Sequence, residues 1–298
     1  MRYIVFNSKG GVGKSSIVCN LAAVSAAEGK RTLVVDLDPQ ANATHYLLGS
    51  RGPEAKPNLT DFFEETLSLR LLTSDADTWV HPTPFENLSI VPSDLGMAEL
   101  PPKLESLHNI YKLRKLLERL EEFDVVFLDT PPALNFFTTS ALIAADGCLI
   151  PFDCDEFSHR ALIQLLEEVE EIREDHNPQL EVRGIVVNLF QLRARLPQQM
   201  VDQLLDENLP VLEPYITASV KMRESHDAHR PLIDLAPSHK LSQQFRDLYA
   251  TLERPRLAAV SSRLEVPAVP AGHGLFHLHR ISRRGPPEWL AWGTASAM

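Results

Sequence analysis

Hydrophobic and polar positions follow two alternating patterns along residues 2–253. Seven short segments are nearly continuous apolar runs, as expected for strands buried on both faces of a parallel sheet. These segments are 3–7, 31–36, 88–93, 124–129, 147–152, 182–190 and 211–216. Between them, apolar residues recur at helical spacing in 14–28, 103–121, 158–175, 197–208 and 239–253. The alternation predicts an α/β fold with a doubly wound, mostly parallel sheet flanked by helices.

This regular pattern stops near residue 253, which predicts one domain, 1–253, followed by a tail, 254–298. The tail contains the segments VPAVPAGHG and RRGPPEW and shows no sustained apolar period. Its six Arg and two Glu give it a charge of +4, which leaves −15 for residues 1–253 of a chain whose net charge is −11. We expect the tail to be irregular or disordered. A solvated tail without a role and a basic contact for membrane or nucleic acid are the two alternatives for it.

Composition excludes several classes of protein. With 298 residues, 44% of them hydrophobic, the chain can bury a large core, which excludes wholesale disorder. No apolar run approaches the roughly 18 residues of a membrane span, so we expect no integral membrane association. The three cysteines, which form no CxxC pair, exclude a disulfide framework and a tetrathiolate metal site. The N-terminal apolar run is too short for a signal peptide, and we therefore expect a cytoplasmic protein.

The first predicted strand leads directly into the glycine-rich segment SKGGVGKSS, residues 8–16, and then into a helix. Glycines at this point let backbone N–H groups wrap closely around a phosphate, and the helix N-terminus adds a positive dipole. Lys14 can reach the β- and γ-phosphates, and the Ser15 hydroxyl can bind Mg²⁺. The strict phosphate-loop pattern GxxxxGK[ST] fails at its first glycine, where Ser8 stands. An ordinary glycine-rich turn is the alternative, but a full GGVGKS after a buried strand argues against it.

Two further strands end in carboxylates. Asp36 closes the segment 31–36 and Asp38 follows it, and Asp129 closes the apolar run of 124–129. Carboxylates at the ends of strands beside a phosphate loop can serve Mg²⁺ and a water nucleophile. Asp and Pro are also frequent in turns, so DLDP on its own would fit turn chemistry equally well.

Together these motifs resemble those of the ParA/MinD class of P-loop ATPases over residues 2–253. KGGVGKS is similar to the deviant Walker A box of that class, DLDPQANAT to its switch I box, and DTPP to the start of its switch II. The resemblance implies that Lys9 reaches across a nucleotide-sandwich dimer to the partner's phosphates. It also implies that Asp38 positions the attacking water, that Asp36 supports the metal shell and that Asp129 holds the water shell of Mg²⁺. The residues expected to bind ATP are Lys9, Gly10, Gly11, Val12, Gly13, Lys14, Ser15 and Ser16.

Two later segments resemble the family more loosely. Asn188 stands where related ATPases read the adenine ring, but an Asn that merely ends a strand fits equally well. ITASVKMRES, residues 216–225, resembles the segment that the family writes I-P-x-x-V-x-x-x-E-A, with Thr217 in place of Pro. His229 and Arg230 stand where Gly and Lys are usual.

Within this class, the switch boxes favour the ParA/Soj partition branch. The cysteines fit neither nitrogenase-reductase-like nor iron–sulfur scaffold relatives. The segment after Glu253 does not hold the helical period of a MinD-like membrane helix. The chain starts directly at its first predicted strand, so we expect no N-terminal helix-turn-helix.

The partition branch implies an ATP-bound homodimer that binds DNA without sequence preference and is associated with the nucleoid. Slow hydrolysis, stimulated by a ParB-like centromere-binding adaptor, would release it. The candidate DNA contacts are Arg193, Lys221 and Arg223, although scattered cations are more often solvated surface and the domain is acidic. A MinD-like or cargo-positioning ATPase that acts on membrane or on a protein assembly is the alternative. A metabolic ligase with the same loop is disfavoured, because Lys9 would then have no evident task.

Overall fold

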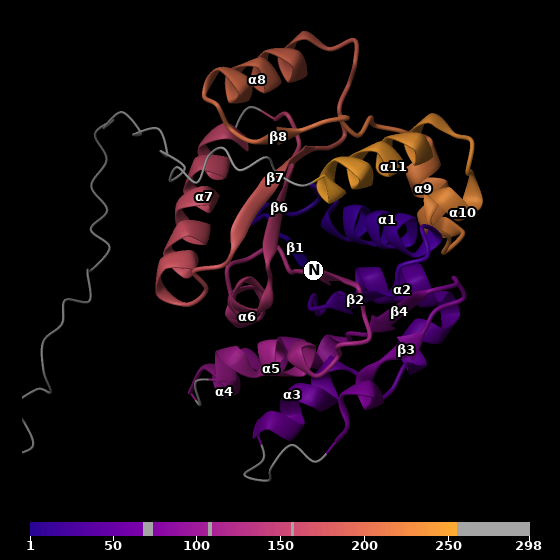
Figure 1. Ribbon diagram of the computed structural model, residues 1–298, viewed down its shortest axis with the longest axis vertical. Coiled ribbons are helices and arrows are strands. Elements are labelled where there is room, and N and C mark those ends of the chain that lie inside the picture. The colour runs from indigo at the N-terminus through magenta and orange to yellow at the C-terminus, as the bar shows by residue number, and fades with distance from the viewer. Residues whose placement is uncertain (68–73, 107–108, 156–157, 255–298) are drawn as a thin grey trace, which may run out of the picture. The chain divides into compact units, whose positions relative to one another are not determined.

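The computed structural model describes residues 1–67, 74–106, 109–155 and 158–254, and it confirms the predicted α/β architecture. Eight strands form one sheet in the order β3-β4-β2-β5-β1-β6-β7-β8 (Figure 1). The strands are β1 (Arg2–Val5), β2 (Thr32–Asp36), β3 (His81–Pro82), β4 (Leu88–Val91), β5 (Val125–Asp129), β6 (Gly147–Phe152), β7 (Glu181–Val187) and β8 (Val211–Leu212). All neighbours pair in parallel except the short edge strand β3, which is antiparallel to β4. The predicted tail lies outside the described residues except for Arg254.

Two predicted strands are shorter than expected, for local reasons. The segment 211–216 contributes only Val211–Leu212, because Pro214 has no N–H to donate to the neighbouring strand. The segment 182–190 ends as a strand at Val187, shortly before Leu189 adopts a left-handed backbone conformation with φ of 54°. Both breaks occur where the chain leaves the sheet toward the candidate site.

The helices cover both faces of the sheet (Figure 1). The described helices are α1 (Lys14–Ala27), α2 (Asn42–Leu48), α3 (Leu59–Leu67), α4 (Pro101–Ser106), α5 (Lys112–Glu118), α6 (Phe136–Ala144), α7 (Ser158–Asp175), α8 (Arg195–Asp206), α9 (Val220–Asp227), α10 (Leu232–Leu235) and α11 (Lys240–Glu253). The predicted helix over 103–121 is wrong as a single element, since α4 and α5 are separate. The sequence pattern also missed α6, because eight of its nine residues are buried and no polar face marks a period.

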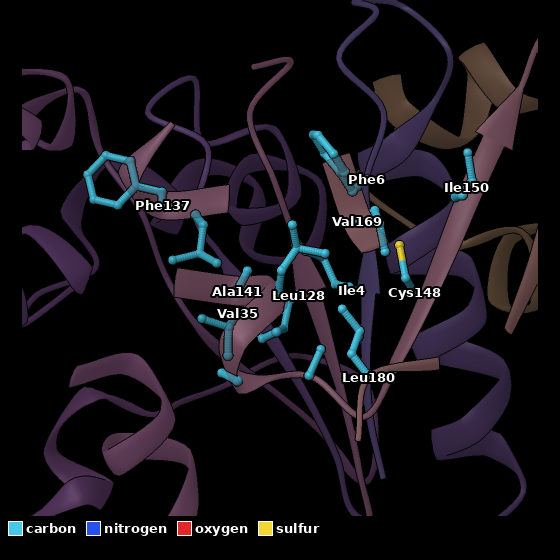
Figure 2. Close-up of a cluster of buried hydrophobic side chains, with 14 of the residues drawn as sticks. Ile4, Phe6, Val35, Leu128, Phe137, Ala141, Cys148, Ile150, Val169 and Leu180 are labelled. Atoms are coloured by element: carbon cyan, nitrogen blue, oxygen red, sulfur yellow. The ribbon is translucent and has the colours of Figure 1, made fainter. Parts of the chain in front are cut away.

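Successive side chains of the central strands point to opposite faces, which creates two cores. Ile4 and Leu128 pack with α6 and α7 on one face, as Figure 2 shows for Phe137, Ala141 and Val169. On the other face, the remaining positions of the same strands pack with α1, α2 and α11. Strands buried on both faces explain why the sequence shows continuous apolar runs instead of an alternating pattern.

The parallel arrangement places the carboxyl ends of β1, β2 and β5 at one edge of the sheet. Val5 is opposite Asp129 in the β1–β5 pair, and Asp36 is opposite Asp129 in the β2–β5 pair. The loops that leave these three strand ends carry the glycine-rich segment and the predicted carboxylates. Ligands bind at this edge in open α/β sheets.

Candidate nucleotide-binding site

A pocket of about 420 Å³ opens at this edge of the sheet. Its lining includes the predicted residues Gly10, Gly11, Gly13, Lys14, Ser15, Ser16 and Asp38. It also includes Gln40 and Asn42 of the DLDPQANAT box and Pro132 of DTPP. His45, Tyr46 and His226 are lining residues that the sequence did not single out. The structure therefore brings the phosphate loop and the switch I segment together. Residues of α2 and α9 complete the pocket lining.

The phosphate loop depends on glycines with left-handed backbone angles. Gly11 has φ of 78° and Gly13 has φ of 88°, conformations that side chains other than glycine rarely adopt. Gly13 directly precedes α1, and no side chain caps this helix, so its first N–H groups remain available to an anion. A Cβ atom on Gly13 would lie 2.3 Å from Nδ2 of Asn188. The loop is thus shaped by both its backbone and its neighbour.

Asn188 contacts this loop through its side-chain amide. It is 4% exposed, and its Nδ2 donates a hydrogen bond of 2.8 Å to the carbonyl oxygen of Val12. The amide therefore holds the phosphate loop in this structure, directly after the end of β7, and the contact of Asn188 with the adenine ring stays a prediction.

Lys14 is a buried cation in the middle of the pocket wall. It is 7% exposed, and its Nζ donates to the carbonyl oxygen of Lys9 at 3.2 Å. Burial lowers the pKa of Lys14, while the charges of Asp129 and Asp38 act in the opposite direction. A phosphate placed in the loop would supply the negative charge that this ammonium group lacks at close range.

The two buried carboxylates, Asp36 and Asp129, have different surroundings. Asp36 accepts hydrogen bonds from the backbone N–H and the hydroxyl of Thr44, at 2.8 and 2.7 Å, and from the N–H of Asp38 at 3.2 Å. Burial raises the pKa of Asp36 to about 7 in spite of these bonds. Its oxygens are largely engaged, so it fixes the start of α2 and the switch I turn, and its support of a metal shell stays a prediction.

Asp129 is fully buried, and within the described residues neither of its oxygens accepts a hydrogen bond of ordinary geometry. Burial, followed by the charge of Asp36, raises its pKa well above the usual range, although the nearby Ser15 hydroxyl lowers it somewhat. An orphaned carboxylate beside a serine hydroxyl is a donor set that suits Mg²⁺. Among the described residues, no group of three or more His, Cys, Asp or Glu side chains could hold a metal ion by itself. Phosphate oxygens and water would therefore have to supply the remaining ligands of such an ion.

Asp38 is a third buried carboxylate and, unlike Asp36 and Asp129, it lines the pocket. It is 6% exposed, and its Oδ1 accepts from the N–H of Gln40 at 2.9 Å. A second bond, from the N–H of Ala41 to the carbonyl oxygen of Asp38, closes the turn. Asp38 thus keeps a fixed place in the pocket wall.

Lys9 pairs with carboxylates of its own chain. Its Nζ lies 2.6 Å from Oδ2 of Asp153 and 2.9 Å from Oδ2 of Asp155, and its side chain is 33% exposed. Partial burial lowers the pKa of Lys9, but the hydrogen bonds to both carboxylates outweigh this and raise it. The sequence analysis missed this pairing. Two Asp residues that follow a predicted strand ending at the same sheet edge were the available signal.

The candidate DNA contacts lie on two neighbouring segments. A bridge between Phe190 and Thr217 joins the loop after β7 to the segment that leads into α9. Arg193 and Arg223 are exposed, while Lys221 pairs with Glu224 on the same helix. The structure therefore brings the two segments that carry these cations next to each other at Phe190 and Thr217. In the part of the chain that the structure describes, no helix is long and apolar enough to span a bilayer.

Comparison with known proteins agrees with this geometry. A family model described as an AAA domain matches residues 1–182. Over 234 residues the chain is 34% identical to the chromosome partitioning protein ParA of Myxococcus xanthus, which covers 77% of this chain and 79% of that protein.

Two solved structures share the fold. Cobyrinic acid a,c-diamide synthase from Mycobacterium smegmatis with bound ADP and magnesium has a TM-score of 0.71 at 25% identity, over 84% of this chain and 92% of that chain. The cell division ATPase MinD of Pyrococcus furiosus has a TM-score of 0.68 at 21% identity, over 85% and 98%. The sequence match extends beyond the phosphate loop through both switch segments, so the chain belongs to the ParA/Soj group of the ParA/MinD family of P-loop ATPases.

Proposed function

We propose that this protein is a DNA partition ATPase whose Mg²⁺- and ATP-bound homodimer binds DNA without sequence preference. The observation that carries the ATPase cycle is the buried Lys14 in the wall of a glycine-lined pocket, with the orphaned carboxylate Asp129 close enough for its charge to act on the pKa of Lys14. A relative is named as a chromosome partitioning protein, which supports DNA as the partner that this ATPase binds. A ParB-like centromere-bound adaptor would stimulate hydrolysis, and the ATP-bound form would be found on the nucleoid within the cytoplasm.

The chain's own residues divide the work of hydrolysis. The loop N–H groups and Lys14 hold and neutralise the phosphates, and Ser15 with Asp129 would hold Mg²⁺. When bound, ATP would supply the phosphoanhydride bond that is hydrolysed, and Mg²⁺ would supply positive charge that shields the phosphates. Asp38 orients a water for attack on this bond. Because a carboxylate near the terminal phosphate would add repulsion and would not assist ATP binding, we assign Asp38 to the hydrolytic step only.

Lys9 would change partners during the cycle. In the single chain it is neutralised by Asp153 and Asp155. In the proposed dimer, its ammonium group would leave these carboxylates for the phosphates held by the other subunit. Because the ammonium group would be paired with negative charge before and after this change, no unpaired buried charge would be created, and the free-energy cost would be small enough for bound nucleotide to drive the change. Dimerisation thereby becomes dependent on ATP.

An equilibrium DNA-binding measurement tests this function. With Mg²⁺ and a slowly hydrolysed ATP analogue, we expect binding to mixed-sequence duplex DNA that weakens steeply between about 50 and 200 mM salt. ADP should not support it. Vesicles of anionic phospholipid serve as the comparison. Binding to vesicles but not to DNA at the lowest salt would overturn the proposal in favour of a positioning ATPase of the MinD kind.

A further inference from the structure

His226 is the residue of α9 that enters the nucleotide pocket. Its Nε2 lies 3.0 Å from Oγ of Ser16, at the start of α1, and its ring stands edge-on to the ring of Tyr46 with centroids 4.6 Å apart. Ser16 belongs to the phosphate loop, 210 positions earlier in the sequence. No motif in the sequence pointed to His226, and the proposed hydrolytic cycle does not use it.

A polar network fastens α9 to the helices that frame the pocket. The hydroxyl of Tyr46, on α2, is hydrogen-bonded to Oγ of Ser225. Nδ2 of Asn20, on α1, donates to the carbonyl oxygen of Ser16 at 2.8 Å and to the Tyr46 hydroxyl at 3.2 Å. Asn20 Oδ1 accepts from the N–H of Leu232 in α10 at 2.8 Å. The phosphate-binding helix therefore contacts α9 and α10 directly, consistent with their grouping in Figure 1.

A bound phosphate would fix the direction of the hydrogen bond between Ser16 and His226. A serine hydroxyl has one hydrogen to donate, and phosphate oxygens only accept. Once Ser16 donates to phosphate, Nε2 of His226 can no longer accept from it. The imidazole then has to donate through Nε2–H, either to the serine oxygen or to the phosphate itself. Phosphate binding thus selects the imidazole as the donor in the link between the loop and α9.

We propose that His226 contacts the phosphate end of the bound nucleotide, alone or through Ser16, and ties the position of α9 to occupancy of the pocket. The part of this inference that concerns DNA rests on the proposed function, since α9 carries Lys221 and Arg223. Nucleotide binding would then order the helix that presents these two cations. By thermodynamic reciprocity, DNA bound to α9 would tighten the nucleotide site.

Two substitutions separate the imidazole nitrogen from the packing of the ring. His226→Phe keeps an aromatic ring against Tyr46 but removes the hydrogen bond to Ser16, whereas His226→Gln keeps a nitrogen donor. His176→Phe is the matched control, because His176 also packs on a tyrosine and bonds its hydroxyl (Tyr111, 3.0 Å) but lies outside the pocket lining. Circular dichroism and thermal melting establish folding, and His226→Ala replaces the Phe variant if that one is unfolded.

Amide hydrogen exchange across Val220–Asp227, with and without Mg²⁺ and a non-hydrolysable ATP analogue, provides a readout independent of activity. We expect the analogue to slow exchange in α9 of the wild-type protein, the His226→Gln variant and the His176→Phe variant, but not of His226→Phe. Affinity for the analogue should fall about tenfold in His226→Phe, the effect of one hydrogen bond to a charged group. Equal protection of α9 and equal affinity in His226→Phe and wild type would overturn the inference.

The same samples distinguish failure of this inference from failure of the proposed function. If the wild-type protein does not bind DNA but α9 becomes protected through His226, the partition function is wrong and the nucleotide contact stands. If DNA binding depends on ATP and His226→Phe changes neither protection nor affinity, the function stands and the contact is wrong.

Discussion

Gly13 and Asn188 lie against each other beneath the phosphate loop, and this contact makes Gly13 a sensitive position. Gly13→Ala would force a β-carbon to within 2.3 Å of the Asn188 amide, at a φ of 88° that costs about 1–2 kcal/mol for an L-residue. We expect a lower melting temperature and the loss of ATP binding, measured by titration with a fluorescent nucleotide. Gly10→Ala is the control for folding, since a β-carbon there meets nothing within 4 Å, and it should melt with the wild type. Normal ATP affinity in Gly13→Ala would contradict the loop geometry.

Asp36 and Asp129 predict how stability depends on pH when nucleotide and Mg²⁺ are absent. Burial raises the pKa of Asp36 from 3.8 to about 7 and raises that of Asp129 well above its usual range. The folded state therefore keeps protons that the unfolded state has released, and their stabilising contribution is full below pH 4. It is lost as pH rises toward and through the folded-state values, at a rate of up to about 1.4 kcal/mol per pH unit for each proton.

Asn cannot titrate, so replacing Asp129 by Asn removes one of the protons that make the free energy of unfolding depend on pH. The melting temperature of nucleotide-free Asp129→Asn should therefore fall less between pH 5 and pH 8, by about one proton's contribution, than that of the wild type. Differential scanning calorimetry in chelated buffer measures this difference. Parallel pH curves for the two proteins would show that Asp129 is not an uncompensated buried group.

At the scale of elements, the short bridge between Phe190 and Thr217 decides which surface segments become neighbours. It holds the loop that follows β7, which carries Arg193, beside the segment that leads into α9, which carries Lys221. The chain as a whole is acidic, with a net charge of −11. A DNA contact would thus have to come from a local group of cations such as this one.

Neutralising both cations in Arg193→Gln/Lys221→Gln should weaken ATP-dependent DNA binding and flatten its salt dependence by about 0.9 for each lost phosphate contact. Hydrolysis without DNA should stay near the wild-type rate. Arg114→Gln/Lys115→Gln, on α5, makes the same change of charge and also breaks a pair with a glutamate of its own helix. If the two double variants lose DNA affinity equally, only net charge matters and the surface has been placed wrongly.

At the scale of the whole molecule, Lys9 and Asp38 belong to different steps of the proposed cycle. Lys9→Ala should bind ATP but remain monomeric, because no ammonium group is left to neutralise the phosphates of the other subunit. Asp38→Ala should bind ATP, dimerise and stay on DNA, because it lacks the group that orients the water. Both variants should lose hydrolysis, yet their oligomeric states should be opposite.

Size-exclusion chromatography with light scattering in Mg²⁺ and ATP shows this difference directly. If both variants are dimers, the cross-subunit role of Lys9 has to be abandoned. If both are monomers, the role of Asp38 in water positioning fails. Asp153→Asn offers a further comparison, since it loosens Lys9 within the chain without altering the pocket lining.

The amino-acid sequence by itself predicted the sheet, the phosphate loop and the order of the carboxylates. These features depend on local chemistry: continuous apolar runs for buried strands, glycines where the backbone must wrap, and Asp at strand ends. The pattern failed for α6, which is buried on nearly all sides, and for the segment 103–121, which leucines alone could not show to be two helices.

Tertiary structure alone decided what each site residue touches. The pairing of Lys9 with Asp153, the support of Val12 by Asn188 and the contact of Ser16 with His226 join positions 144, 176 and 210 residues apart. Strand order and register set these contacts, and no local pattern encodes them. The same cause distinguishes two carboxylates that look alike in the sequence: Asp36 accepts two hydrogen bonds from Thr44, whereas neither oxygen of the buried Asp129 has a hydrogen-bond partner among the described residues.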